Sequence, residues 1–169
     1  MFDSTTRTPT PSSHRSELGS PVVSSPPAAN TDVFCRIVAG DLNAAVVART
    51  QEMIAFLDHR PVFKGHVLVA PVAHVDTLLD LPPSLMAPLL TLTQRIARGI
   101  GVALGAEGSF VAMNNVVSQS VPHLHMHVVP RWAGDTNFMT VVGDTKVLPE
   151  TLAETFARVS ARLHAEPPR

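Results

Sequence analysis

The sequence predicts an α+β fold: a mainly antiparallel five-stranded sheet with one long central helix and a C-terminal helix. Three observations lead to this class. Short β-branched or apolar runs follow one another with few residues between them, which favours antiparallel neighbours. One stretch in the middle of the chain has apolar residues at spacings of three and four, the pattern of a long helix. A second stretch with this spacing lies near the end of the chain.

The first expected elements precede the long helix. Residues 32–40 are apolar on one side and end at Gly40, which favours a short helix closed by that glycine. Three apolar or β-branched runs are expected as strands: 44–50, 53–59 and 66–72. The polar pair Gln51 and Glu52 separates the first two runs, which indicates a hairpin. Pro71 should end the third strand or place it at an edge, because proline has no N–H for the ladder.

The remaining elements complete the sheet and add two helices. Five residues at helical spacing mark the central helix: Leu85, Leu89, Leu92, Ile96 and Ile100. Ser84 is its expected N-cap, and Pro88 requires the helix to start late or to bend there. Two more strands are expected at 108–115 and 123–130. A last series marks a C-terminal helix that begins near Pro149: Leu152, Phe156, Val159 and Leu163.

Composition predicts one folded domain with a tail. Residues 1–31 are rich in Ser, Thr and Pro and are expected to be a disordered tail, which leaves residues 32–169 as the domain. Thirteen Lys and Arg against fourteen Asp and Glu give a net charge of -1, which argues against binding nucleic acid by bulk charge. No apolar run is long enough to cross a bilayer. Cys35 is the only cysteine, which excludes an internal disulfide and favours a reducing compartment, the cytoplasm.

Three of the eight histidines lie in the short stretch VPHLHMHVVPR. On a strand, His123, His125 and His127 would share one face, and Leu124 and Met126 would point into the core. A solvated face needs no histidine, since Lys, Glu or Thr would serve equally. The outer two α-carbons would lie roughly 13 Å apart, so three rings on a straight strand cannot easily reach one metal ion. The run therefore favours a row of imidazoles beside an extended anion such as a polyphosphate.

This arrangement suggests nucleophilic chemistry. A neutral imidazole is a nucleophile near pH 7, and its attack on phosphorus gives a phosphoramidate intermediate. His125 is flanked by a histidine on both sides and is the best candidate for the nucleophile. The neighbouring rings would hold phosphate oxygens or assist the leaving group.

The same residues carry a resemblance to a known family. HLHMHVV matches the pattern H-φ-H-φ-H-φ-φ, in which φ is apolar, and FCRIVAG, AFLDHRPVFKGHVLVAPVAHVDTLLDL and NNVVSQSVPHLHMHVVPR follow in the expected order. From Asp32 to Leu163 the chain resembles the histidine triad (HIT) superfamily of nucleotide hydrolases and transferases. The segment after the triad is similar to that of HIT diadenosine polyphosphate hydrolases and phosphorylases. The resemblance implies a HIT-like fold, a purine nucleotide as substrate and a homodimer.

It also implies roles for the histidines. His125 matches the nucleophile that becomes nucleotidylated at the α-phosphorus, and His127 matches the residue near the leaving group. The backbone carbonyl of His123 would orient the nucleophilic ring. His66 matches an additional histidine behind the triad, and the alternative for it is a core residue that only braces His125.

The nucleotide contacts follow in the same way. Asp58 stands where the family has a residue that binds the ribose hydroxyls, although a solvated loop acid is an open alternative. Four polar residues before the triad resemble phosphate contacts: Asn114, Asn115, Gln119 and Ser120. They could equally form turns, and their loop lacks the glycines common in relatives. Arg131 could supply charge for a distal phosphate, although a single exposed arginine is usually only surface.

The expected metal chemistry is limited. Many relatives have a C-x-x-C motif that holds structural zinc together with two histidines, whereas here Asp32 replaces the first cysteine. A mixed site would combine Asp32, Cys35, His74 and His123. We expect instead a degenerate site without zinc, in which Cys35 is a small buried residue. No cofactor is required beyond a divalent cation such as Mg²⁺ that accompanies the substrate.

The sequence thus predicts an enzyme that cleaves a phosphoanhydride in a dinucleoside polyphosphate, such as diadenosine tetraphosphate, through a nucleotidyl intermediate on His125. Two alternatives stay open. One is a nucleoside phosphoramidase with the same nucleophile. The other is a nucleotide-binding or metal-binding module with little turnover, whose ligand binding would survive His125→Ala.

Overall fold

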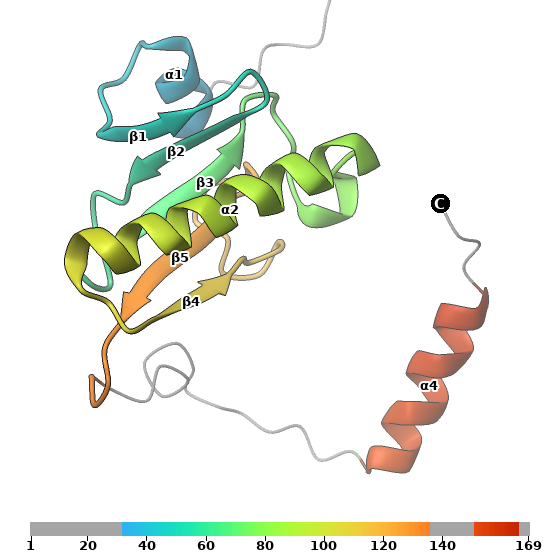
Figure 1. Ribbon diagram of the computed structural model, residues 1–169. Helices are drawn as coiled ribbons and strands as arrows, with labels where there is room; N and C mark the ends of the chain where they lie inside the picture. Colours follow the sequence, from blue (N-terminus) through green and yellow to red (C-terminus); the bar gives the residue numbers. More distant parts are fainter. Residues whose placement is uncertain (1–31, 136–150, 166–169) are drawn as a thin grey trace, which may run out of the picture.

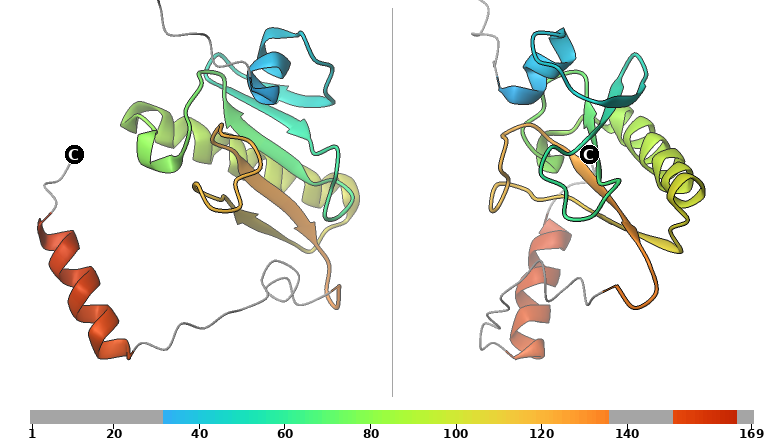
Figure 2. Two further views of the ribbon diagram at one scale, coloured as in Figure 1. Left: turned by 180° about the vertical axis from the view of Figure 1, so that it is seen from behind. Right: turned by 90° about the vertical axis from the view of Figure 1, so that its left-hand side faces the viewer.

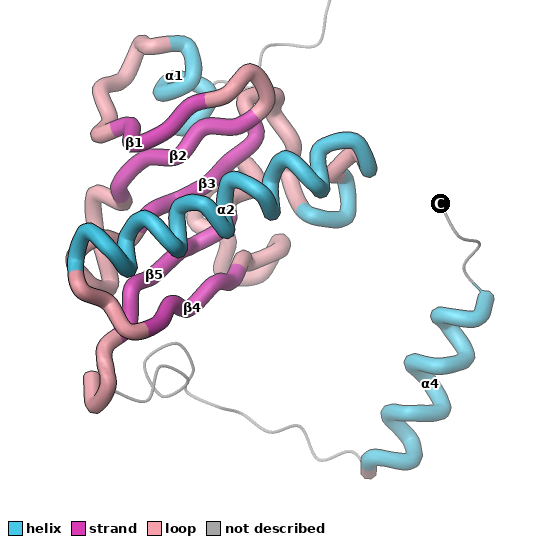
Figure 3. Tube along the Cα trace, in the orientation of Figure 1, coloured by secondary structure: helices cyan, strands magenta, loops and turns pink. Residues whose placement is uncertain are grey.

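The computed structural model describes residues 32–135 and 151–165. The tail expected at 1–31 and the expected helix start near Pro149 lie outside these residues. The described chain forms one five-stranded sheet in the order β1-β2-β3-β5-β4, in which all neighbours are antiparallel (Figures 1 and 3). The expected α+β class with a five-stranded antiparallel sheet is confirmed.

The first helix and hairpin form as the sequence predicts. Helix α1 spans Val33–Ala39, and the Asp32 carboxylate caps it by accepting hydrogen bonds from the backbone N–H groups of Phe34 and Cys35. Gly40 ends the helix at φ 86°, a conformation that glycine adopts without strain. Strands β1 (Val46–Arg49) and β2 (Met53–Leu57) then pair around the polar turn.

The segment that carries the histidines runs through the middle of the sheet. Strand β3 (Val67–Pro71) ends at its proline, as expected, and lies inside the sheet rather than at an edge. Strand β5 (Met126–Arg131) lies between β3 and the edge strand β4 (Gly108–Ala112). This position buries β5 between two partners and fixes the side chains that it presents to each face.

The two faces of the sheet have different covers. The long helix α2 (Pro83–Leu104) crosses one face, and α1 lies on the other (Figure 2). The core under α2 contains Met53, Ala55, Val67, Val69, Leu89, Leu92, Ile96, Leu124, Met126 and Val128. The core on the α1 side contains Phe34, Ile37, Ile54, Phe56, Leu68 and Ala70. Leu124 and Met126 therefore pack under α2, as the alternating pattern predicts.

The start of α2 differs from the expectation. Ser84 is not the N-cap: the helix begins at Pro83 after Pro82, which makes no side-chain capping bond. A proline suits the first helical position because the N–H that it lacks would have no partner there. The helix also includes Pro88, so it does not start late. A short 3₁₀ helix, η1 (Leu78–Asp80), precedes it.

The expected C-terminal helix is present as α4 (Leu152–Ala165). In Figures 1 and 2 it lies apart from the sheet and α2. Three apolar side chains at helical spacing are mostly exposed: Phe156, Val159 and Leu163. Among the described residues, no helix is long and apolar enough to span a membrane.

Candidate functional site

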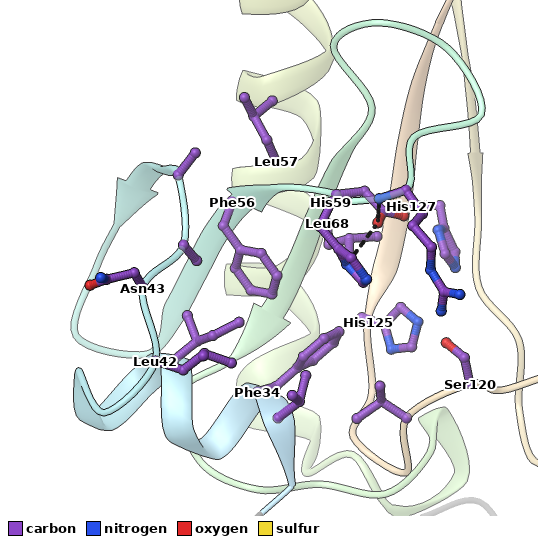
Figure 4. A pocket seen from close by; sticks show the side chains of 17 residues that line it. Phe34, Leu42, Asn43, Phe56, Leu57, His59, Leu68, Ser120, His125 and His127 are labelled. Atoms are coloured by element: carbon purple, nitrogen blue, oxygen red, sulfur yellow. Dashed lines mark hydrogen bonds and ion pairs between the residues drawn. The ribbon is translucent and has the colours of Figure 1, made fainter.

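A cavity of about 670 Å³ opens on the α1 side of the sheet. One wall is apolar and is formed by Phe34, Ile37, Leu42, Phe56 and Leu68. The other end is polar and is formed by Asp58, His59, Arg60, Ser120, His125 and His127. Figure 4 shows His125 between the ring of Phe34 and Ser120, with His127 beyond it. The cavity thus joins an apolar surface, suited to a flat aromatic group, to a row of polar groups.

His125 is buried and held in one orientation. Its Nδ1 lies 2.7 Å from the backbone carbonyl oxygen of His123, so Nδ1 carries the proton and donates it to that oxygen. The lone pair of the neutral ring is then on Nε2. The edge of the Phe34 ring packs against the imidazole, with 5.0 Å between the ring centroids. The side chain at the cavity is therefore an oriented imidazole with a nucleophilic nitrogen.

His127 is held by a different neighbour. Its Nδ1 lies 3.0 Å from Nε2 of the buried His66. The backbone N–H of Val62 donates to Nδ1 of His66 at 3.4 Å, and on this contact we assign the proton of the His66 ring to Nε2, although Asp58 Oδ2 also lies 3.4 Å from Nδ1. That proton is donated to Nδ1 of His127, so the neutral His127 ring carries its own proton on Nε2. His127 is therefore a hydrogen-bond donor beside the nucleophilic His125.

Burial keeps these three imidazoles neutral. Burial lowers the pKa of His125 below 6.5, and it is also the main cause of the lowered pKa of His66. Burial, together with the nearby His125 and His66, lowers the pKa of His127 to about 4. At neutral pH none of the three rings carries a charge. The site can therefore attack phosphorus and donate hydrogen bonds, but its histidines supply no positive charge.

Two further predicted residues line the cavity. The Asp58 carboxylate accepts a hydrogen bond from the backbone N–H of Arg60 at 2.9 Å, and its side chain is 16% exposed. Its second oxygen lies 3.4 Å from Nδ1 of His66. Ser120 lines the cavity from the loop before the triad. The fold thus brings two polar side chains to the catalytic candidates: Asp58 lies beside His66, and Ser120 lines the same cavity as His125.

The other three expected phosphate contacts do not line this cavity. The Asn115 side chain accepts from the backbone N–H of Leu78 at 2.8 Å, and the Gln119 side chain donates to the carbonyl oxygen of Asp76 at 2.6 Å. These bonds hold their loop against the segment before α2. Asn114 is exposed and does not line the cavity either. The loop turns through Val116 at φ 65°, a conformation unusual for a β-branched residue, which directs these side chains elsewhere.

His123 is also placed differently from the expectation. Strand β5 begins at Met126, so His123 and His125 precede it, and the three rings do not form one row. The His123 side chain is fully buried and does not line the cavity. Its Nε2 donates to the carbonyl oxygen of Pro71 at 3.0 Å, and its Nδ1 lies 3.3 Å from Asp32 Oδ2. His123 therefore serves the cavity through its backbone carbonyl only.

The ring of His123 lies instead in a cluster with Asp32, Cys35 and His74. Each residue offers one atom that could bind a metal, and these four atoms all lie within 4.8 Å of one another. Cys35 Sγ is 3.1 Å from Asp32 Oδ2, and His74 Nδ1 is 2.9 Å from the same oxygen. Burial and the Asp32 carboxylate raise the pKa of the Cys35 thiol to about 11. One sulfur, two imidazole nitrogens and one carboxylate form a donor set that suits tetrahedral Zn²⁺.

The cavity includes functional candidates that sequence reasoning missed. The sequence analysis did not single out the residues of the apolar wall, because periodicity does not separate a cavity wall from a packed interior. Arg60 follows Asp58 by two positions in a loop and shows no pattern of its own. Arg131, the expected source of charge, is engaged by the Asp135 carboxylate, with its Nε 2.6 Å from Oδ2.

The site defines a class: a nucleotide-sized cavity with an oriented histidine nucleophile and a second histidine as donor. A family model described as "HIT domain" matches residues 39–134, and the chain belongs to the HIT family. The AP-4-A phosphorylase of Mycobacterium tuberculosis is 39% identical over 118 residues, which are 68% of this chain. The match spans 60% of the phosphorylase's length.

Two further relatives extend the comparison. The adenosine 5'-monophosphoramidase hnt1 of Schizosaccharomyces pombe is 36% identical over 101 residues, which are 59% of this chain and 73% of that protein. The crystal structure of a zinc-bound histidine triad family protein from Mycobacterium smegmatis superimposes with a TM-score of 0.61 at 33% identity. It covers 78% of this chain and 97% of that protein.

Proposed function

We propose that this protein cleaves a phosphoanhydride bond in a dinucleoside polyphosphate, such as diadenosine tetraphosphate, through a covalent nucleotidyl intermediate on His125. The orientation of the His125 ring carries the proposal. Its bond to the His123 carbonyl oxygen, 2.7 Å long, leaves the lone pair on Nε2 in a cavity that is apolar at one end. A purine fits the apolar wall, and the α-phosphate then lies at the polar end near His125.

The chemistry takes two displacements at the α-phosphorus. Nε2 of His125 attacks, the P–N bond forms, and the bond to the bridging oxygen breaks with its electron pair on the departing ATP. The Nε2–H of His127 donates a hydrogen bond to that oxygen as charge develops on it. Water or inorganic phosphate then attacks phosphorus, and the electron pair of the P–N bond returns to Nε2. The products are AMP and ATP with water, or ADP and ATP with phosphate.

Similarity supports this substrate class and also the alternative. The phosphorylase from Mycobacterium tuberculosis has a name that specifies AP-4-A, and it is the basis for favouring a diadenosine polyphosphate. The phosphoramidase from Schizosaccharomyces pombe supports a second candidate, cleavage of a P–N bond by the same His125. Both reactions use one nucleophile, so they differ only in the leaving group that the cavity accepts.

The test is chromatography of the products from diadenosine tetraphosphate, with and without inorganic phosphate, for the intact protein and for His125→Ala. We expect ATP together with AMP or ADP from the intact protein, and a loss of at least a thousandfold in rate in the variant, because no other described residue replaces the nucleophile. ADP that appears only with phosphate would identify a phosphorylase. Absence of turnover in both buffers would refute the anhydride substrate, and adenosine phosphoramidate would then be tested.

Ser120 and Asp58 have supporting roles in this proposal. Asp58 lies at the polar end with one oxygen held by the Arg60 N–H, where it would accept hydrogen bonds from the ribose hydroxyls. Ser120 would donate to a non-bridging oxygen of the α-phosphate. A divalent cation such as Mg²⁺ would accompany the remaining phosphates. We place the protein in the cytoplasm, as a homodimer.

The sequence alone favours a degenerate site without zinc, but because four donor atoms converge in the structure we propose instead that the cluster of Asp32, Cys35, His74 and His123 binds a structural Zn²⁺. The donor set fits the ion, and the four residues already converge. The zinc-bound relative from Mycobacterium smegmatis supports the proposal at the level of the family. An ion here would brace the His123 segment, and through its carbonyl oxygen the orientation of His125.

A further inference from the structure

The phosphate chain of the proposed substrate needs positive charge, and His125 and His127 do not supply it. The pKa values of His125 and His127 are lowered, so both rings are neutral at pH 7. A dinucleoside polyphosphate carries a negative charge on each phosphate. Among the described residues that line the cavity, Arg60 is the only one with a permanent positive charge.

Other cations near this end of the sheet are engaged elsewhere. Arg131 pairs with Asp135, and neither residue lines the cavity. The Lys64 ammonium lies over the ring of Trp132, 5.3 Å from its centroid. His59 also lines the cavity, but its Nδ1 lies 3.6 Å from Asp58 Oδ1. Arg60 is therefore the cation that this cavity offers.

The backbone of Arg60 is held in place. Its N–H donates to the Asp58 carboxylate, and the N–H of Asp58 donates to the carbonyl oxygen of His66 at 3.0 Å. The N–H of Val62 donates to the His66 ring, which closes the loop on the same residue. The loop that carries Arg60 is thus held by hydrogen bonds to Asp58 and His66, and His66 contacts His127. The backbone that carries Arg60 therefore has a defined position at the cavity.

The exposure of Arg60 indicates which phosphate it meets. The residue is exposed, whereas His125 is 3% exposed and lies deeper. With a purine on the apolar wall and the α-phosphate at His125, the rest of the phosphate chain leaves through the open end of the cavity. A guanidinium there can donate two parallel hydrogen bonds to phosphate oxygens.

We propose that Arg60 binds the phosphates beyond the α-phosphate and so makes the protein select substrates with a phosphate chain over those with a single phosphate. This inference rests on the proposed function, since it takes His125 as the site of the α-phosphate. It separates the two candidate reactions at one residue: a dinucleoside polyphosphate contacts Arg60, and adenosine phosphoramidate does not.

Binding of AMP, ADP and ATP tests the inference without turnover. Titration calorimetry would compare the His125→Ala variant with double variants that also carry Arg60→Gln or Arg60→Lys. We expect Arg60→Gln to weaken ADP and ATP at least tenfold and AMP less than twofold, while Arg60→Lys keeps part of the difference. Arg98→Gln on α2, across the sheet, removes the same charge and should change none of the affinities. Equal loss for AMP and ATP, or no loss for either, would overturn the assignment.

A kinetic comparison keeps this result distinct from the proposed function. In the chain with His125 intact, Arg60→Gln should lower kcat/KM for diadenosine tetraphosphate at least tenfold, mainly through KM, and leave adenosine phosphoramidate within twofold. An equal loss for both substrates would contradict the role of Arg60. If the intact protein cleaves only the phosphoramidate, the proposed function fails, and the AMP, ADP and ATP affinities still decide the role of Arg60.

Discussion

His125 and His127 present different atoms to the cavity because a different neighbour fixes Nδ1 of each ring. The carbonyl oxygen of His123 accepts the Nδ1 proton of His125, whereas Nε2 of His66 donates to Nδ1 of His127. One ring therefore offers a lone pair and the other offers a proton. Two identical side chains, two positions apart, take the roles of nucleophile and donor through these contacts alone.

The lowered pKa values predict how activity depends on pH. Protonation of Nε2 removes the lone pair of His125, and burial moves the pKa of this ring below 6.5. We therefore expect the acid limb of kcat/KM to be centred below pH 6.5. Rates of diadenosine tetraphosphate cleavage between pH 4 and 9 would measure this. An acid limb centred at or above pH 6.5 would contradict the neutral, buried ring.

Stability must be measured in the same buffers. The pKa of His127 is about 4 in the folded protein and about 6.5 in an unfolded chain. Between these values the unfolded chain binds more protons, so the free energy of unfolding decreases as the pH falls from 6.5 toward 4. Melting temperatures across this range separate loss of the nucleophile from loss of the fold, and His127→Asn should flatten their decrease.

At the scale of single residues, the sequence predicts the role of a residue better than the direction in which its side chain points. Alternation along HLHMHVV correctly places Leu124 and Met126 under α2. It fails for His123, because β5 starts only at Met126 and the chain before it is not extended in a regular strand. The directions of Asn115 and Gln119 depend on a loop with a residue at positive φ, which no periodicity encodes. Arg60 is a single cation in a loop, so its place at the cavity emerges only from the fold.

At the scale of elements, α1 links the metal-binding candidates to the active-site candidates. Asp32 Oδ1 caps the helix, and Oδ2 contacts Cys35, His74 and His123. Phe34, the second residue of the same helix, packs on the rings of both His123 and His125. A change at Asp32 therefore affects a helix terminus, a buried cluster and a wall of the cavity together.

Zinc binding is testable on this element. We expect one Zn²⁺ per chain and a rise in melting temperature of at least 5 °C when zinc is added to metal-free protein, because an ion held only by the folded state stabilises it. Cys35→Ser should abolish most of the rise. Plasma emission spectroscopy and thermal denaturation would measure both quantities.

A second group of donors calls for a matched control. Asp58, His66 and His127 also offer ligand atoms within 4.8 Å of one another. His66→Asn disrupts that group and leaves the Asp32 cluster intact, so this variant should keep the zinc-dependent rise. If His66→Asn loses the rise and Cys35→Ser keeps it, the ion binds in the cavity and the proposed structural site is wrong.

Sequence patterns are most informative where an element is regular. The hairpin, the third strand and the Gly40 helix end follow from turn residues and apolar runs, and all three form. The predicted start of α2 was wrong. Serine is the commoner N-cap, but here Pro83 supplies a first helical residue whose φ is already fixed. Local preferences thus identify the helix but not which of two compatible starts it uses.

At the scale of the whole molecule, the sheet separates a packed face from a binding face. Helix α2 covers one face with a continuous core, whereas the short α1 covers only part of the other (Figure 2). The cavity lies on the α1 side of the sheet. Residues 124–127, before and at the start of β5, alternate between these faces. The same alternation that builds the core under α2 therefore delivers His125 and His127 to the cavity.

Helix α4 carries a stripe of exposed apolar residues. Phe156, Val159 and Leu163 are 70%, 52% and 65% exposed and lie along one side of the helix. A stripe of this kind in water favours burial against another surface. We expect a second copy of the chain to provide that surface in the proposed homodimer.

Light scattering coupled to size exclusion tests this arrangement on the full chain. We expect a dimer for the intact protein and a shift toward monomer for the double change Phe156→Glu and Leu163→Glu, because two carboxylates cannot be buried in an apolar contact without a large cost. Ala161→Glu lies on the opposite side of α4 and should leave the dimer intact. A monomeric intact protein would refute the homodimer, whereas a dimer that survives the double change would place the interface on the sheet domain instead of α4.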